Sequence, residues 1–134
     1  MGKLAPAVTS IFLLSGCADL IVTAVDDVPF LTTNRMLRST VKNDGWWSAP
    51  ASHTKLEVKM PTSSSFAQMA NTPTPALGRG EQAELQMWPF NVSTLVAAGQ
   101  CIEVRVCADS DSSVNEGWFG GEGNNCTTRS FCRN

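Results

Sequence analysis

Four cysteines near the C-terminus have a spacing that suits cross-strand disulfides. They lie in the segments CIEVRVC (101–107) and CTTRSFC (126–132), and in each segment the two thiols are six residues apart. Two residues six apart in a strand point from the same face, but about 20 Å separates them. A disulfide spans Cα separations of only about 4.4–6.8 Å. Each cysteine therefore needs a partner in the other segment.

One antiparallel register supplies both partners. Facing residues of antiparallel strands have numbers with a constant sum, and Cys101 with Cys132 has the same sum as Cys107 with Cys126. At non-hydrogen-bonded sites, facing Cα atoms lie about 4.5 Å apart, within disulfide range. The other cross-pairing needs a crossed register. The sequence thus predicts the disulfides Cys101–Cys132 and Cys107–Cys126, and we expect a structural role because no CxxC redox spacing is present.

The same register separates the two faces of this hairpin. Glu103 and Arg105 share the cysteine face, which we expect to be solvated, whereas Ile102 and Phe131 belong to a face that points into a core. Arg129 falls on the core-facing side. Its aliphatic stem must therefore carry the charge out to the sheet edge.

The fifth cysteine, Cys17, follows a segment that is typical of exported proteins. One cation, Lys3, precedes a mainly apolar run that ends at Leu14. About 10–14 apolar residues are too few to cross a bilayer as a helix, but they suit the core of a signal peptide. The tetrapeptide LSGC (14–17) resembles the bacterial lipobox. That resemblance implies cleavage before Cys17 and attachment of diacylglycerol to its thiol, with fatty acids such as palmitate.

We therefore expect a lipoprotein signal peptide over residues 1–16 and a lipid-anchored domain over residues 17–134. Several fatty chains on one residue hold a protein durably on a membrane. Ala18 after the cysteine is typical of outer-membrane lipoproteins, so the expected location is the cell envelope, and in a Gram-negative cell the outer membrane rather than the inner. Exported spaces are oxidising, which agrees with two disulfides. The alternatives are an ordinary cleaved signal peptide, or a buried N-terminal strand with a free thiol.

Few residues suit enzymatic chemistry. The chain has 134 residues, enough for one small domain, and a single histidine, His53. With one histidine and the remaining thiols paired, neither a Cys–His dyad nor a His-rich metal site is available, and no serine lies in a G-x-S-x-G context. The formal net charge of −2 provides no basic footprint for nucleic acid. We therefore expect neither catalysis nor a nucleic-acid partner.

The rest of the chain has the pattern of short antiparallel strands. Apolar and polar residues alternate in segments that end at turn residues such as Asn43-Asp44-Gly45. Residues 62–75 are expected to form a loop or a ragged edge, and residues 91–99 to lead through a glycine into the hairpin. The pattern predicts an all-β, Ig-like antiparallel β-sandwich of about seven strands with a disulfide-stapled C-terminal hairpin. Before the hairpin, the expected strands are DLIVTAV (19–25), MLRSTVK (36–42), TKLEVKM (54–60) and EQAELQMWPF (81–90).

The order of several motifs adds a resemblance. A D-L-x-V start lies at residues 19–22, a V-x-N-x-G turn at 41–45, an L-x-x-G bend at 77–80, and a closing V-x-V strand with acidic and Asn residues at 104–125. In this order and spacing, the chain resembles the CARDB family, the cell-adhesion-related Ig-like domain of bacteria. The four cysteines, a GWFGG insertion and a longer Ser/Pro-rich middle depart from the family pattern. The resemblance implies an Ig-like fold in a surface protein.

The tip of the last hairpin is acidic. The segment DSDSSVNEGWFGGEGNN (109–125) carries four carboxylates, with Asn124 and Asn125 nearby. Oxygen ligands of this kind suit Ca²⁺, although the EF-hand pattern is absent. The alternative is a solvated turn whose Asp and Asn side chains bond their own backbone. The candidate calcium ligands are Asp109, Asp111, Glu116 and Glu122, and we expect no other cofactor.

Four aromatic residues lie in expected loops beside glycines: Trp46, Trp47, Trp118 and Phe119. Loop aromatics can form sugar-stacking or protein-binding platforms, or they can plug the open ends of a sandwich. In Ig-like topology the B–C and F–G loops share one end. That arrangement predicts a joint aromatic surface with an acidic rim.

The sequence therefore predicts a non-catalytic envelope lipoprotein that acts as an adhesion or protein-interaction module. Its expected partners are the membrane, through the lipid on Cys17, and an envelope or extracellular protein or glycan. One alternative is a carbohydrate- or solute-binding lipoprotein. Another is a structural subunit of the cell surface that self-associates through exposed strand edges.

Overall fold

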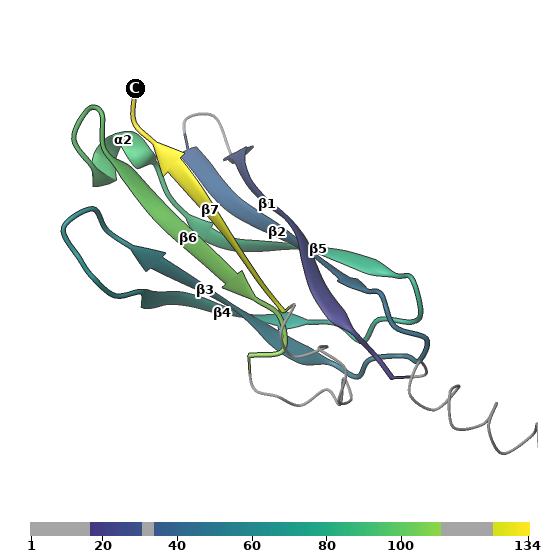
Figure 1. The fold of residues 1–134 in the computed structure, drawn as a ribbon. Coiled ribbons are helices and arrows are strands. Elements are labelled where there is room, and N and C mark those ends of the chain that lie inside the picture. The colour runs from purple at the N-terminus through teal and green to yellow at the C-terminus, as the bar shows by residue number, and fades with distance from the viewer. Residues whose placement is uncertain (1–16, 31–33, 111–124) are drawn as a thin grey trace, which may run out of the picture.

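The computed structural model describes residues 17–30, 34–110 and 125–134, which are mostly β-strand (Figure 1). The expected signal segment, residues 1–16, lies outside this part of the chain, so the division into signal and domain stays a prediction. The elements are β1 (Leu20–Phe30), β2 (Asn34–Asn43), β3 (Ser52–Lys59), β4 (Ala67–Thr74), β5 (Gln82–Pro89), α2 (Val92–Leu95), β6 (Cys101–Cys107) and β7 (Cys126–Cys132).

The strands form two antiparallel sheets that face each other (Figure 1). One sheet has the strand order β1-β2-β5 and the other the order β4-β3-β6-β7. This arrangement confirms the predicted all-β, Ig-like sandwich. It differs from a constant-type immunoglobulin domain in its fourth strand, which there joins the first sheet and here lies beside β3.

Alternating hydrophobicity explains which side of each strand is buried. Along β3, buried and partly exposed residues alternate without interruption. Because neighbouring residues in a strand point to opposite faces, one row enters the core while the other remains in solvent. The side chains of both sheets meet in this core. Its most completely buried apolar residues are Leu20, Leu37, Val41, Leu56, Val58, Ile102, Val104 and Val106.

The C-terminal hairpin has the predicted register and disulfides. Cys101 faces Cys132 and Cys107 faces Cys126 across β6 and β7. Both pairs are bonded, with S–S distances of 2.03 and 2.08 Å and a Cα–Cα separation of 4.0 Å in each. The prediction from even spacing is therefore confirmed at both ends of the hairpin.

Arg129 connects the edges of the two sheets. Its Nη1 group donates hydrogen bonds to the backbone oxygen of Val25 at 2.5 Å and to Oδ1 of Asp26 at 3.2 Å, both on β1. Nearby, the hydroxyl of Thr127 donates to the backbone oxygen of Val22 at 2.9 Å. The charge does reach the sheet edge, as the register predicts, and there it ties β7 to the opposite sheet.

Two segments differ in detail from the sequence-based expectation. Residues 62–75, expected as a loop or a ragged edge, contain β4, one of the two edge strands of the four-stranded sheet, so the edge alternative agrees with the structure and the loop does not. Pro73 lacks a backbone N–H, which an edge strand tolerates, and a buried hydrogen bond of 2.7 Å joins the hydroxyls of Thr54 and Thr74. Residues 91–99 contain the short helix α2, which was not foreseen. Asn91 caps it, because its Oδ1 accepts a hydrogen bond from the backbone N–H of Ser93 at 3.1 Å.

Candidate functional site

Three chain segments meet at one end of the sandwich, which we call the Cys17 end: residues 17–19, the β2–β3 link at 43–47 and the β4–β5 link at 77–81. Figure 1 shows the start of β1 and both links at this end, away from the C-terminus. The backbone N–H of Trp46 donates to the oxygen of Cys17 at 3.1 Å, and that of Asp44 donates to the oxygen of Asp19 at 2.8 Å. Cys17 is therefore part of the folded domain.

Asn43 is the polar centre of the Cys17 end. Its side chain is fully buried, with 0% exposure. Its Oδ1 accepts hydrogen bonds from the backbone N–H groups of Asp19 at 3.1 Å and Gly45 at 3.0 Å. Its Nδ2 donates to the backbone oxygens of Trp47 at 2.6 Å and Leu77 at 3.0 Å. One amide thus satisfies backbone groups in all three segments.

Gly45 allows the β2–β3 link to approach residues 17–19. A Cβ atom at this position would lie 2.1 Å from the backbone oxygen of Cys17 and 2.6 Å from the backbone nitrogen of Asp19. These are rigid backbone atoms, so a larger residue would push the two segments apart. Gly45 and Asn43 together bring the tryptophan pair beside Cys17.

Trp46 and Trp47 are half exposed on the surface of this end, at 48% and 49%. The guanidinium carbon of Arg79 lies 3.6 Å from the ring centroid of Trp46, a cation–π contact. A shallow hollow of about 210 Å³ adjoins the ring and is also lined by Lys42, Asp44 and Gly80. Of the two expectations for these aromatics, a surface platform agrees with their exposure better than a plug of the core does.

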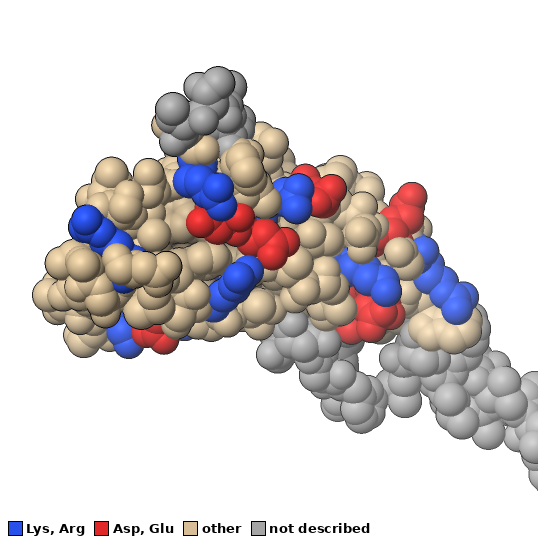
Figure 2. Space-filling model, turned by 90° about the horizontal axis from the view of Figure 1, so that it is seen from above, with Lys and Arg blue, Asp and Glu red and all other residues tan. Residues whose placement is uncertain are grey.

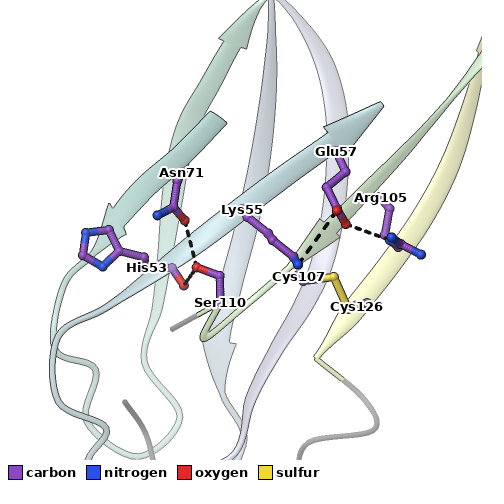
Figure 3. Close-up of polar contacts among 8 residues, drawn as sticks. All are labelled: His53, Lys55, Glu57, Asn71, Arg105, Cys107, Ser110 and Cys126. Carbon is purple, nitrogen blue, oxygen red and sulfur yellow. Dashed lines mark hydrogen bonds and ion pairs between the residues drawn. A yellow bond between two sulfur atoms is a disulfide. The ribbon is translucent and has the colours of Figure 1, made fainter. Parts of the chain in front are cut away.

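The base of the β6–β7 tip lies beside the start of β3. Figure 3 shows Ser110 between His53 and Asn71. The backbone N–H of Ser110 donates to the oxygen of His53 at 2.8 Å, and its hydroxyl donates to Oδ1 of Asn71 at 2.8 Å. The B–C and F–G type links therefore lie at the same end, as Ig-like topology implies. Trp118 and Phe119, the other expected aromatics, lie outside the described residues.

The candidate calcium site lies mostly outside the described part of the chain. Asp111, Glu116 and Glu122 are among residues 111–124, and only Asp109 belongs to the described structure. Asp109 is 4% exposed, with a φ of 53°. Within residues 17–30, 34–110 and 125–134, no group of three or more His, Cys, Asp and Glu side chains is arranged to hold a metal ion. Asn125, near the proposed ligands, instead donates from Nδ2 to the backbone oxygen of Ala108 at 3.3 Å.

The outer face of the four-stranded sheet carries alternating charges between the two disulfides. Nε of Arg105 and Oε1 of Glu57 are 2.9 Å apart, and Nζ of Lys55 is 3.8 Å from the same carboxylate (Figure 3). The Arg105 guanidinium also covers the ring of Phe66 at 4.1 Å. On the face drawn in Figure 2, basic and acidic side chains lie beside one another without a large area of one sign. Such a surface offers hydrogen bonds and small apolar contacts rather than long-range attraction.

A second hollow, of about 400 Å³, lies at the opposite end of the sandwich. Its wall combines the ring of Trp88, stacked on Phe90 at 5.7 Å, with the side chains of Arg35 and Asn91. This hollow is not evident from the sequence, where the alternation around Trp88 and Phe90 indicates only a strand. No helix in the described residues is long and apolar enough to cross a membrane.

Comparison with known proteins agrees with this architecture. A model of the CARDB family matches residues 17–129. The chain belongs to the CARDB family. No curated protein matches it. Among the solved structures that match is the CARDB domain of a Pyrococcus furiosus protein in complex with di-metal ions. It has a TM-score of 0.58 and 22% sequence identity, over 88% of this chain and 90% of that one.

Membership of the CARDB family confirms the predicted family, and the structure gives the V-x-N-x-G pattern of residues 41–45 a physical meaning. In this chain the motif's Asn43 is the buried amide that joins three segments, and its Gly45 is the close approach to Cys17. Sequence reasoning found the turn and missed the amide's role. The V-x-N-x-G pattern contains both features: Asn43 supplies the buried amide, and Gly45, two residues later, has no Cβ atom to block the approach to Cys17. CARDB is a family of non-enzymatic Ig-like domains, and at the level of the family the match suggests an adhesion-like module.

Proposed function

We propose that this chain is a lipid-anchored interaction module of the bacterial cell envelope that binds another envelope or extracellular protein without catalysis. The observation that carries the proposal is the position of Cys17. It lies three residues before the start of β1, is partly exposed and takes part in neither disulfide. A lipid on this thiol would leave the opposite end of the sandwich available to a partner.

The outer face of the four-stranded sheet is the surface that best suits a protein partner. It presents paired charges, with Glu57 only 13% exposed between Lys55 and Arg105. Partly buried ion pairs of this kind hold hydrogen-bonding groups in fixed positions at an interface. Two disulfides and a core-packed inner face keep this sheet rigid, which lowers the entropy cost of association.

Metabolic labelling tests the anchoring. Cells that express the full chain are grown with labelled palmitate, and the membrane fraction is compared with that from cells with Cys17→Ser. We expect label and membrane retention for the wild type and neither for Cys17→Ser. An unlabelled wild-type protein, recovered from the soluble fraction, would contradict the proposal.

A second candidate function is carbohydrate or small-solute binding at the Trp88 hollow. A stacked aromatic pair beside Arg and Asn side chains suits sugar binding. The rings can pack against the apolar face of a sugar, and the polar side chains can bond its hydroxyl groups. Titration of oligosaccharides against tryptophan fluorescence tests it. A saturable change that Trp88→Phe abolishes would favour this function over protein adhesion.

Self-association and calcium binding are further proposals with direct tests. The edge strand β4 leaves one side of its sheet open to another strand, so sedimentation of the detergent-extracted protein would reveal oligomers. The metal-bound Pyrococcus furiosus neighbour is a reason to titrate Ca²⁺ against the acidic tip. The outer membrane remains our proposed location in a Gram-negative cell.

A further inference from the structure

We propose that Trp46 and Trp47 rest in the headgroup region of the bilayer that holds the Cys17 lipid, so that the domain is seated on the membrane by its Cys17 end. The inference rests on the proposed lipidation of Cys17. It adds a second contact with the membrane and fixes which end of the domain faces it.

A short, ordered path of backbone joins Cys17, the proposed site of the lipid, to the two tryptophans. The backbone oxygen of Cys17 accepts a hydrogen bond from Trp46 at 3.1 Å. Asp19, two residues on, is bonded to Asn43 and Asp44 at 3.1 and 2.8 Å. No spacer therefore separates the lipid from the folded domain. Once acyl chains on Cys17 enter a bilayer, the residues packed around Cys17 must come to the membrane surface.

The exposed side chains at the Cys17 end are of a kind that favours the membrane surface. Among the described residues, three large apolar side chains are exposed: Trp46, Trp47 and Met69. Two of the three are at the Cys17 end. Tryptophan is enriched at membrane–water interfaces, because its ring is apolar while its N–H remains a hydrogen-bond donor. Arg79, stacked on Trp46, supplies a cation at the level of lipid phosphates.

The charge of the Cys17 end distinguishes an electrostatic contact with anionic lipid from a contact made by the tryptophan rings. The three segments of the Cys17 end carry one cation, Arg79, and three carboxylates, Asp19, Asp44 and Glu81, a net charge of −2. Lys42, just before them, lies 3.7 Å from the carboxylate of Asp44, and the β6–β7 link at this end adds no cation. A surface with this balance is not attracted to anionic lipid. The contact must then depend on the tryptophan rings. We therefore expect it on zwitterionic phosphatidylcholine and expect salt to leave it unchanged.

Trp88 provides an internal control. It lies seven residues beyond Glu81 along β5, so about 20 Å of strand separates it from the Cys17 end. It lines the hollow at the opposite end of the sandwich. In the proposed orientation Trp88 faces away from the membrane, whereas Trp46 and Trp47 lie in its surface.

The test is tryptophan quenching in vesicles. The background protein is the full chain with Trp118→Phe. It is extracted from membranes, and its mass must show lipid on Cys17. It is then reconstituted into phosphatidylcholine vesicles whose acyl chains either carry bromine atoms near the headgroup end or carry none. Two further variants are compared in the same background. One replaces Trp46 and Trp47 with Phe, and the other replaces Trp88 with Phe.

We expect brominated lipid to lower the emission of the background protein and of the Trp88→Phe variant by at least half, in 0.5 M NaCl as in low salt. The variant that retains only Trp88 should keep its emission. Equal quenching of both variants, or no quenching, would overturn the proposal. If Trp46→Ala with Trp47→Ala instead abolishes cross-linking to an envelope protein while quenching is absent, the pair binds protein rather than lipid. A protein without lipid on Cys17 contradicts the proposed anchoring itself, so the two failures are distinguishable.

Discussion

Replacement of Asn43 by Ala should be among the most destabilising substitutions at the Cys17 end. The change removes four hydrogen bonds from a side chain with 0% exposure. It leaves the N–H groups of Asp19 and Gly45 without their acceptor, and each unsatisfied buried group costs about 1–3 kcal/mol. The two donated bonds contribute about 0.5–1.5 kcal/mol each. Because such terms are not additive, we expect a total loss of about 3–5 kcal/mol.

Urea unfolding followed by far-ultraviolet circular dichroism measures this loss without reliance on the nearby tryptophans. With a slope of roughly 1.5 kcal/mol per M, the midpoint should fall by about 2–3 M. Asn43→Asp should also destabilise the fold, because it removes both donated bonds and points an acceptor at the oxygens of Trp47 and Leu77.

The matched control is Asn71→Ala. Asn71 is exposed and its side chain accepts a bond from the Ser110 hydroxyl at 2.8 Å. Exposed substitutions of this type change stability by less than about 0.5 kcal/mol. If the midpoints of Asn43→Ala and Asn71→Ala coincide, the central role given to the Asn43 amide is wrong.

Three further results are expected. Replacement of both Cys101 and Cys132 by Ser, which opens a bridge with a sequence separation of 31, should lower the free energy of unfolding by about 3 kcal/mol in urea without reductant; an unchanged midpoint would show that the bridge does not form in the native protein. Gly45→Ala, whose Cβ would meet the Cys17 oxygen at 2.1 Å, should cost about 1–3 kcal/mol and speed proteolysis near Cys17, and equal cleavage rates would contradict the close approach. Calorimetry in 5 mM Ca²⁺ and in EDTA should give the same melting temperature if the acidic tip is a solvated turn, whereas a site with a dissociation constant of about 0.1–1 mM would add about 1–2 kcal/mol.

The register of the β6–β7 hairpin was predictable because it follows from the spacing of four cysteines. Two cysteine pairs with equal, even spacing fit one register, so the bonds followed from strand geometry. Arg129 was predictable for the same reason, since a charge on a core-facing row must reach an edge. The partner it finds, the backbone oxygen of Val25, was not predictable, because nothing in the sequence of β7 indicates that β1 lies beside it.

Asn43 shows why the site was only partly predictable. The turn preferences of Asn, Asp and Gly are enough to explain the sequence Asn43-Asp44-Gly45. For that reason the sequence gives no indication of the long-range hydrogen bonds that the Asn43 side chain makes. Its bond to Leu77 joins residues 34 apart in sequence, and only the packing of both sheets creates it. For residues 62–75 the sequence left a loop and a sheet edge both open, because pairing with β3, rather than the weak alternation of β4 itself, holds this strand in place.

The most direct test of the account is the mass of the N-terminal peptide of the protein extracted from membranes and digested without reduction. We expect a peptide that begins at Cys17 and carries a diacylglyceryl group on sulfur and a fatty acyl group on nitrogen, together with peptides cross-linked through Cys101–Cys132 and Cys107–Cys126. An N-terminal peptide that retains residues 1–16, or one with an unmodified Cys17 thiol, would contradict it.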